Sequence, residues 1–263
     1  MSVRVPPSLK RRLDPEHRFG LRVTLFALAA VLVFVPFGLL LDHVVDGGPL
    51  TARDRALATD LHDQMREDPR WVPVFRVLSF LGLPAWLWVV VGSVSVRLWL
   101  RGRRRLVAYL ATTGLFGAGI ELAVKYLVAR PRPVLEDPFA TAHGRSFPSG
   151  HAFNSTVVYG MLLLVFFPVI ARRVRPWLVG AYLLLVAGVC LSRLALGVHF
   201  LTDVVGGFVL GVAWLAASTA AFSIWRTERG APPVDASEGV EPESALDLRA
   251  HRTAPSWRGD SNP

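Results

Sequence analysis

The chain has 263 residues, 52% of them hydrophobic, and a mean hydropathy of +0.41. A soluble domain of this length is rarely so apolar, so the composition excludes an ordinary soluble protein and favours a membrane protein. The formal net charge of +9 would suggest a nucleic-acid partner for a soluble protein. Here the basic residues form short groups beside apolar segments, which argues against nucleic acid.

Six apolar segments follow one another, each close to the ~20 residues with which a helix crosses a bilayer. They cover approximately residues 23–41, 72–96, 106–127, 151–170, 177–196 and 204–225. We therefore expect an all-α fold, a polytopic membrane bundle of six transmembrane helices in one membrane domain, residues 21–225. The first segment lacks a small-residue cleavage site and is interpreted as an uncleaved anchor. The single cysteine, Cys190, lies inside an apolar segment and excludes a disulfide framework.

The distribution of charge over the connecting loops predicts the orientation in the membrane. The first 22 residues hold six basic and two acidic residues, residues 97–105 hold five Arg and no acid, and residues 172–175 hold three Arg and no acid. Residues 42–71, by contrast, hold four basic and seven acidic residues. Short basic loops stay in the cytoplasm, so we expect a multi-pass protein of the cell membrane with both termini inside.

The segments outside the apolar runs differ in character. Residues 1–20 are expected to form a cytoplasmic tail, and residues 226–263, rich in Pro, Gly, Ser and charge, a disordered cytoplasmic tail. Residues 51–66 predict a short external amphipathic helix, with Thr51 and Asp54 as its cap and apolar residues at four-residue spacing. Packing on the bundle is its expected role, with guidance of a lipid as the alternative, and His62 is expected to be solvated.

The third apolar segment carries one of only two lysines in the chain, Lys125, near its outer end. A lysine offers a compact charge that suits one phosphate oxygen, although a lysine at this depth can also extend to the lipid headgroups. Glu121 lies four residues earlier, where it can pair with Lys125 on the helix surface. We interpret Glu121 as structural support for the lysine.

Arg132 lies between Pro131 and Pro133, seven residues after Lys125. Proline cannot continue a helix and biases the residue before it to extended geometry, so the helix should end near Ala129. Arg132 would then stand on a rigid strip, where a guanidinium can bind two phosphate oxygens at once. Arg130 is a second candidate, for which a headgroup contact and a substrate contact are equally plausible.

The sequence Phe-Pro-Ser-Gly-His at residues 147–151 directly precedes the fourth apolar segment. Gly150 permits close approach of the backbone, and Ser149 can cap the following helix or donate a hydrogen bond to an anion. A helix N-terminus offers free N–H groups and a positive dipole end, which favour an anion. His151 would stand in the first turn of that helix, which makes it a candidate catalytic residue.

A second polar stretch lies between the fifth and sixth apolar segments, with Ser192 and Arg193 at its start. Gly197 provides a turn, and His199 and Asp203 follow at a spacing that places both on one helix face. A carboxylate one turn from an imidazole can accept the Nδ1 proton, which leaves Nε2 free to attack. The alternative is a local His–Asp pair that only satisfies a buried polar residue.

These residues resemble the three signatures of the type-two phosphatidic acid phosphatase superfamily, which is related to the vanadium haloperoxidases. Lys125 to Pro133 matches the first signature, Pro148 to His151 the second, and Ser192 to Asp203 the third. All three occur intact and in order. The resemblance is to the integral-membrane branch of the superfamily, and it covers approximately residues 20–225 of this chain.

The resemblance implies a role for each position. His199 would be the nucleophile that forms a phosphohistidine, Asp203 would orient it, and His151 would protonate the leaving alkoxide. The phosphoryl oxygens would be held by Lys125, Arg132, Ser149, Gly150 and Arg193, with Glu121 and Ser192 as possible support. Three cations in one pocket of low dielectric repel each other, so an empty site of this kind favours a multiply charged anion.

We therefore expect a lipid phosphatase at the outer membrane face, acting on a phosphatidate, a phosphatidylglycerophosphate or a polyprenyl diphosphate. Neither a metal nor another cofactor is expected, because the apolar segments carry only two acids, Glu121 and Asp203. A phosphotransferase with a hydroxyl acceptor stays open. An anion transporter is disfavoured because the charges gather at one face. A soluble haloperoxidase is disfavoured by the apolar segments.

Overall fold

The computed structural model describes residues 38, 41–42 and 49–244. In these ranges four helices are long and apolar enough to cross a membrane: α6 (Arg104–Val128), α7 (Gly150–Phe166, continued by a 3₁₀ turn to Val169), α8 (Arg175–Ala195) and α9 (Leu201–Glu228). Helix α7 is the most buried and contacts α5, α6, α8 and α9. The described part of the chain contains no strand. An all-helical membrane bundle is therefore confirmed.

The α7–α9 contact is close because small residues line it. A Cβ atom at Gly207 of α9 would lie 2.5 Å from the carbonyl oxygen of Ser149, and one at Gly211 would lie 2.9 Å from Cβ of Thr156. Helices in a membrane associate through such small-residue faces, because apolar burial alone does not distinguish a neighbouring helix from lipid. The tight contact fixes the start of α7 against the start of α9.

The predicted second span, residues 72–96, is not one straight helix. It consists of α4 (Val72–Leu81), preceded by a 3₁₀ turn at Pro69–Trp71, and α5 (Pro84–Leu100), and the two halves are bent by 44°. The break is local in origin: Leu83 is extended, and Pro84 begins the new helix. Since proline has no N–H and disfavours helical geometry in the residue before it, the chain cannot continue α4 through this point.

The predicted number of six spans is not confirmed. The first predicted span, residues 23–41, lies outside the described residues apart from two helical positions, Gly38 and Leu41. The described helices supply four spans, or five if the bent pair of α4 and α5 counts as one. Leu41 packs against a cluster formed by α6, α7 and α9.

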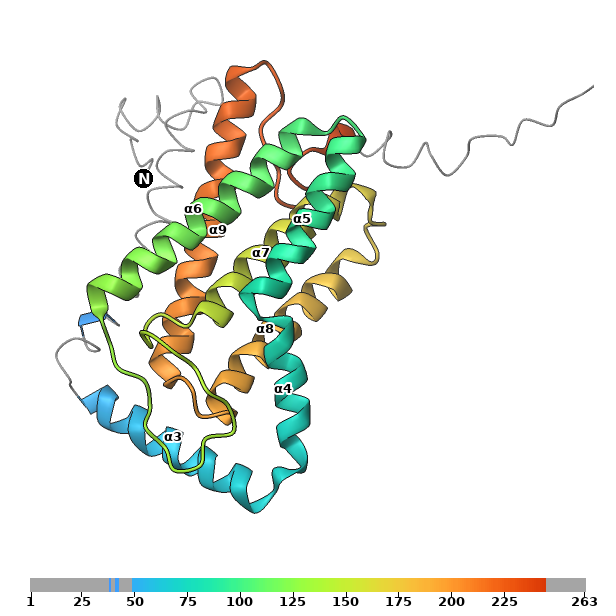
Figure 1. Cartoon of the computed structure of the whole chain (residues 1–263). Coiled ribbons are helices and arrows are strands. Elements are labelled where there is room, and N and C mark those ends of the chain that lie inside the picture. Colours follow the sequence, from blue (N-terminus) through green and yellow to red (C-terminus); the bar gives the residue numbers. More distant parts are fainter. Residues whose placement is uncertain (1–37, 39–40, 43–48, 245–263) are drawn as a thin grey trace, which may run out of the picture.

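The predicted amphipathic helix is present as α3 (Pro49–Glu67), which lies across the end of the bundle where α6 ends and α9 begins (Figure 1). Its sequence expectations need two corrections. His62, expected to be solvated, is buried and bonded to the backbone oxygen of Glu136 at 2.6 Å. The helix begins before Thr51, whose hydroxyl has no hydrogen-bond partner among the described residues, so Thr51 is not its cap.

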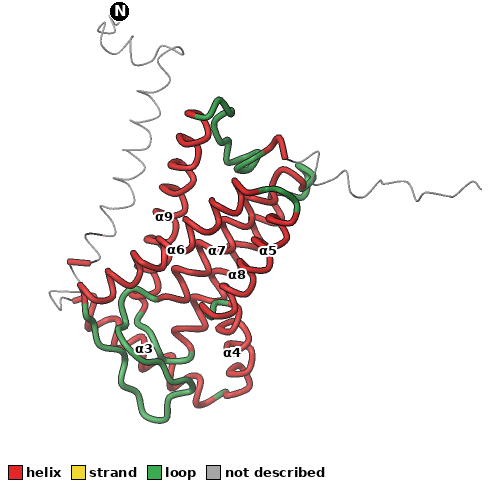
Figure 2. Tube along the Cα trace, turned by 45° about the horizontal axis from the view of Figure 1, so that its top comes forward, coloured by secondary structure: helices red, strands yellow, loops and turns green. Residues whose placement is uncertain are grey.

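The predicted disordered tail, residues 226–263, needs correction for its first part. Residues 229–244 fold back on the bundle end opposite α3 and finish in a 3₁₀ turn at Pro242–Ser244 (Figure 2). Buried Arg226 donates to the backbone oxygen of Val240 and pairs with Glu243, while Glu238 pairs with Arg172 at 2.7 Å. The composition resembled a solvated tail because its charges find their partners only in the folded structure. Residues 245–263 lie outside the description.

Candidate active site

His199 lies in the short connection between α8 and α9, where it is buried with only 2% of its surface exposed. Its Nδ1 atom is 3.3 Å from Oδ2 of Asp203, and its Nε2 atom is 3.0 Å from a terminal nitrogen of Arg132. The turn at Gly197, with φ of +71°, directs the chain into this arrangement. The imidazole of His199 is therefore contacted by Asp203 of its own signature and by Arg132 of the first signature.

The contact with Arg132 fixes the tautomer of His199. A guanidinium can only donate hydrogen bonds, so Nε2 must accept with its lone pair. The neutral ring then carries its proton on Nδ1 and donates it to Asp203. Burial, together with the smaller effects of Arg132 and Arg193, lowers the pKa of His199 to about 4 against the opposing effect of Asp203. The result is a neutral imidazole with an available Nε2 lone pair, the form that a nucleophile requires.

The carboxylate of Asp203 is fully buried and held by four donors. Besides His199, it accepts hydrogen bonds from Arg130 at 2.5 Å, from the backbone N–H of Phe200 at 2.9 Å and from the hydroxyl of Ser146. Sequence reasoning did not identify Ser146, and it left Arg130 as a possible phosphate or headgroup contact. The structure places the Arg130 guanidinium on Asp203 instead.

Arg132 stands on the extended strip after α6, which ends with Ala129 in a left-handed conformation, as expected from Pro131. Its guanidinium donates to three backbone oxygens, those of Val198 at 2.8 Å, Gly144 at 3.2 Å and His143 at 3.3 Å. Backbone oxygens orient the group without cancelling its charge. A positive group in fixed orientation therefore points at the His199 ring.

Lys125, in the last turn of α6, reaches the same region. It pairs with Glu121 at 3.3 Å, which confirms the predicted i, i+4 contact, and it donates to the backbone oxygen of Pro148 at 2.8 Å. Glu121 also accepts a hydrogen bond from Asn154 of α7 at 2.6 Å. The lysine is thereby tied to the turn that contains the second signature.

The second signature forms the start of α7. The hydroxyl of Ser149 is buried and, among the described residues, has no hydrogen-bond partner, so it does not cap the helix. A Cβ atom at Gly150 would lie 2.5 Å from Oε1 of Glu121, so a larger residue here would displace the Glu121 side chain. His151 stands in the first turn of α7, within electrostatic range of His199 and of all three signature cations. An unpartnered buried hydroxyl beside these groups is suited to receive an anion.

Arg193 and Ser192, at the end of α8, behave differently. The guanidinium of Arg193 is buried and donates to the hydroxyl of Ser79 on α4, and within the described ranges its Nε atom has no hydrogen-bond partner. Ser192 bonds to the backbone oxygen of Val189 in its own helix at 2.6 Å, so its support is confined to α8. Sequence analysis missed Ser79, because only the folded chain brings α4 against α8.

The signature side chains therefore lie within electrostatic range of one another, and their charges favour an anion. Within the described part of the chain Arg132 and Arg193 form no ion pair, and Lys125 shares only one carboxylate. No three His, Cys, Asp or Glu side chains of that part gather as a metal site would require. The unbalanced positive charge makes a phosphate group the natural guest.

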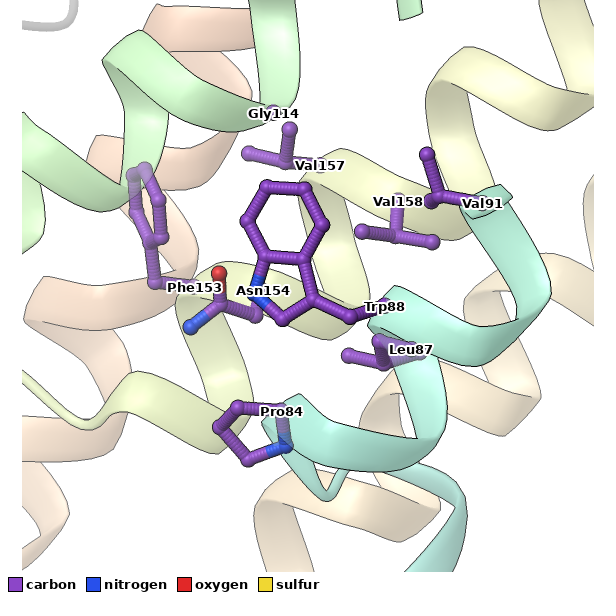
Figure 3. A pocket seen from close by; sticks show the side chains of 9 residues that line it. All are labelled: Pro84, Leu87, Trp88, Val91, Gly114, Phe153, Asn154, Val157 and Val158. Carbon is purple, nitrogen blue, oxygen red and sulfur yellow. The ribbon is translucent and has the colours of Figure 1, made fainter. Parts of the chain in front are cut away.

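An apolar cleft adjoins this polar space between α5, α6 and α7 (Figure 3). The indole of Trp88 occupies its middle, with Asn154 and Phe153 on one side and Val91 and Val158 on the other. The remaining cavity of about 10 Å³ has the space that one water molecule needs. Asn154 borders both regions, because its amide donates to Glu121 beside Lys125.

Comparison with known proteins agrees with the fold and the signatures. Residues 105–226 match the PAP2 superfamily. It is similar to phosphatidylglycerophosphatase B of Bacillus subtilis strain 168, with 34% identity over 93 residues, which are 34% of this chain and 44% of that protein. The alignment thus spans less than half the length of that curated relative.

A solved structure shares the fold. It is described as the crystal structure of the first transmembrane PAP2 type phosphatidylglycerolphosphate phosphatase from Bacillus subtilis. The TM-score is 0.64 at 23% sequence identity, and the superposition covers 72% of this chain and 93% of that one. Together with the apolar helices, this likeness identifies the chain as a multi-pass membrane protein of the PAP2 fold.

Proposed function

We propose that this protein is a lipid phosphatase that hydrolyses a phosphate monoester of a membrane lipid without a metal, through a phosphohistidine on His199. The observation that carries the proposal is the fixed tautomer of His199, whose proton lies on the Asp203 side and whose Nε2 lone pair faces a guanidinium. An anion bound to that guanidinium would bring its phosphorus next to the lone pair. A histidine serving only as a buried polar residue needs no such partner.

In the first step the phosphate of the lipid takes the place of Nε2 as the partner of Arg132. Lys125, Arg132 and Arg193 hold the non-bridging oxygens, and the free hydroxyl of Ser149 donates to one of them. Nε2 of His199 then attacks phosphorus, so that an N–P bond forms while the P–O bond to the lipid breaks. His151 donates a proton to the departing alkoxide, and the Asp203 carboxylate stabilises the positive charge on the His199 ring.

In the second step water attacks the phosphohistidine in line with the N–P bond. His151, now neutral, accepts a proton from that water, and the N–P bond breaks to release inorganic phosphate. His199 returns to the neutral form with its proton on Nδ1. His151 thus serves as acid and then as base. Lys125, Arg132 and Arg193 form a cationic cradle that neutralises the charge of the transferring phosphoryl group in both steps.

The substrate class follows from the surroundings of the site. The signature residues stand at the ends of α6, α8 and α9, which have the length and hydropathy of membrane spans, so a phosphate in the cradle would lie close to lipid headgroups. The two similar proteins are named for phosphatidylglycerophosphate, which makes it the first substrate to test. Phosphatidate and polyprenyl diphosphates present the same terminal phosphate and form the rest of the substrate panel.

The proposal is tested by phosphate release from this panel, with purified protein in mixed micelles that contain a chelator. His199→Ala should lower turnover by at least about 10³-fold, as the loss of a covalent nucleophile does in other enzymes. His143→Ala, which removes an exposed histidine of the α6–α7 loop, is the matched control and should leave turnover unchanged. Undiminished turnover in His199→Ala would exclude the phosphohistidine mechanism.

The acceptor is decided in the same assay. Water as acceptor gives one inorganic phosphate for each dephosphorylated lipid, whereas a hydroxyl acceptor gives a new phosphate ester in its place. Adding glycerol as a competing acceptor should leave the yield of inorganic phosphate unchanged if water is preferred. A fall in that yield, with a matching rise of glycerol phosphate, would identify a phosphotransferase.

A further inference from the structure

Arg130 lies two residues before Arg132, but its guanidinium is directed into the protein. It is 7% exposed and stacks over the ring of Phe200 at 4.3 Å. One terminal nitrogen is 2.5 Å from Oδ1 of Asp203, and the other is 2.9 Å from Oδ2 of Asp54. Both carboxylates are almost fully buried. One cation therefore joins the carboxylate behind His199 to a carboxylate of the interfacial helix α3.

Asp54 also completes the start of α9. The first N–H groups of a helix need partners outside it, and the residue before α9 is Phe200, whose side chain cannot accept a hydrogen bond. The carboxylate of Asp54 accepts from the backbone N–H of Thr202 at 3.1 Å and from the Thr202 hydroxyl. A negative group at this position also interacts favourably with the helix dipole. Helix α3 thereby caps the turn of α9 that carries Asp203.

We infer that Arg130 and Asp54 are positioning residues for the nucleophile, and that helix α3 is part of the catalytic apparatus rather than only a surface helix. This inference rests on the proposed function. Arg130 holds one oxygen of Asp203, while the other receives the proton of His199. Asp54 holds Arg130 and fixes the start of α9. Asp54 lies outside residues 105–226, the family match, so this part of the apparatus is supplied by the N-terminal part of the chain.

The inference separates Arg130 from Arg132 in a way that can be measured. A phosphate ligand contributes to the affinity for phosphate, whereas a positioning residue contributes to the rate of the chemical step. Displacing reacting groups by about 1 Å can cost about 100-fold in rate. We therefore expect Arg130→Gln to slow the single-turnover rate constant by about 100-fold, and Asp54→Asn to slow it by about 10-fold.

Single-turnover kinetics with enzyme in excess distinguishes positioning from a loss of folded protein. The amplitude reports the fraction of competent enzyme, while the rate constant reports the chemistry in each competent molecule. A purely structural role would lower the amplitude and leave the rate constant unchanged, which would overturn the inference. Asp60→Asn, an exposed carboxylate on the same helix, is the matched control and should change neither quantity.

Arg130→Gln leaves two buried carboxylates without their cation and can fail to fold. Two further variants keep the inference testable. Arg130→Lys retains the charge and should recover part of the rate constant, and the double variant Asp54→Asn/Arg130→Gln removes one of the two buried carboxylates that Arg130→Gln leaves without a cation. In the double variant the two effects should be less than multiplicative, because both residues act through one chain of contacts. Fully multiplicative effects would contradict a shared role.

An activity-independent measurement separates failure of this inference from failure of the proposed function. The stabilisation of the purified protein against heat by inorganic phosphate reports binding in the cradle. Arg132→Gln should weaken that binding by about 10-fold or more, while Arg130→Gln or Arg130→Lys should change it by less than about threefold. Weakening by Arg130→Lys equal to that by Arg132→Gln would make Arg130 a phosphate ligand and overturn the inference, whether or not lipid turnover is observed.

Discussion

At the scale of single residues, the arrangement of the candidate site follows from which side chains can donate a hydrogen bond and which can accept one. The guanidinium of Arg132 cannot accept a hydrogen bond, so its contact with Nε2 determines the tautomer of His199. The backbone oxygens that hold Arg132 leave its positive charge available. Asp203, in turn, is saturated with donors and stays a carboxylate. The same imidazole is therefore oriented from both of its nitrogen atoms.

The burial of neutral His199 predicts a pH-dependent contribution to stability. The pKa of His199 in the folded chain, about 4, lies below the value of 6.5 for an exposed histidine. Between these two pH values the unfolded chain therefore binds a proton at this residue and the folded chain does not. Stability is then complete above pH 6.5 and falls as the pH is lowered towards 4. A shift of this size corresponds to about 3 kcal/mol when the transition is complete.

The measurement compares thermal unfolding in detergent at about pH 7.5 and about pH 4.5 for the native chain and His199→Gln. The native chain should lose more stability between the two pH values, by about 2 to 3 kcal/mol. His143→Gln, on an exposed loop, should behave like the native chain. An equal loss in all three proteins would mean that His199 is not buried in its neutral form.

Leaving-group dependence tests His151, the other histidine of the site. We expect His151→Gln to slow phosphate release from a lipid monoester, whose alkoxide needs a proton, by about 10² to 10⁴-fold. Release from an activated aryl phosphate, whose phenolate departs unaided, should be affected much less. Equal loss on both substrates would assign His151 to binding or structure rather than to proton transfer.

At the scale of elements, the break between α4 and α5 brings backbone and side chains of a membrane span to the site. Ser79 accepts from Arg193, and the oxygen of Leu81 accepts from Tyr159 at 2.7 Å. Hydropathy predicted one continuous span here, because an average over the window is insensitive to a single turn. The signal that marks the break is local: Gly82 followed by Leu83 and Pro84.

Gly82 offers a test of this element. A Cβ atom there would overlap Cγ1 of Val189 and lie 3.2 Å from Cδ2 of His151. Gly82→Ala should therefore destabilise the protein by about 1 to 3 kcal/mol through overpacking, and it should also lower turnover by displacing His151. Gly92→Ala, on α5 where nothing lies within 4 Å, is the matched control and should be neutral or stabilising. Similar stability of the two variants would contradict the close contact.

At the scale of the whole molecule, the sequence predicted features that are local in the chain and missed contacts between residues that are distant in it. The signature residues were found because each signature is contiguous, and contiguous stretches fix their own turns and helix starts. Asp54 and Ser79 could not be found, because their partners, Arg130 and Arg193, lie far along the chain. The same limit applies to His62 and to Arg226, which composition treats as solvated charge and the fold buries.

Orientation in the membrane is a property of the whole chain and follows from its charge asymmetry. Arg clusters at residues 97–105 and 172–175 stand at the end of the bundle opposite α3, so the positive-inside rule predicts that the candidate site faces the exterior. With Cys190→Ser as background, Thr141→Cys near the site should react with a membrane-impermeant thiol reagent on intact cells. Arg173→Cys, equally exposed at the opposite end, should react only after the membrane is permeabilised. The reverse pattern would place the phosphate cradle on the cytoplasmic side, because both cysteines are exposed and only the bilayer separates them from the reagent.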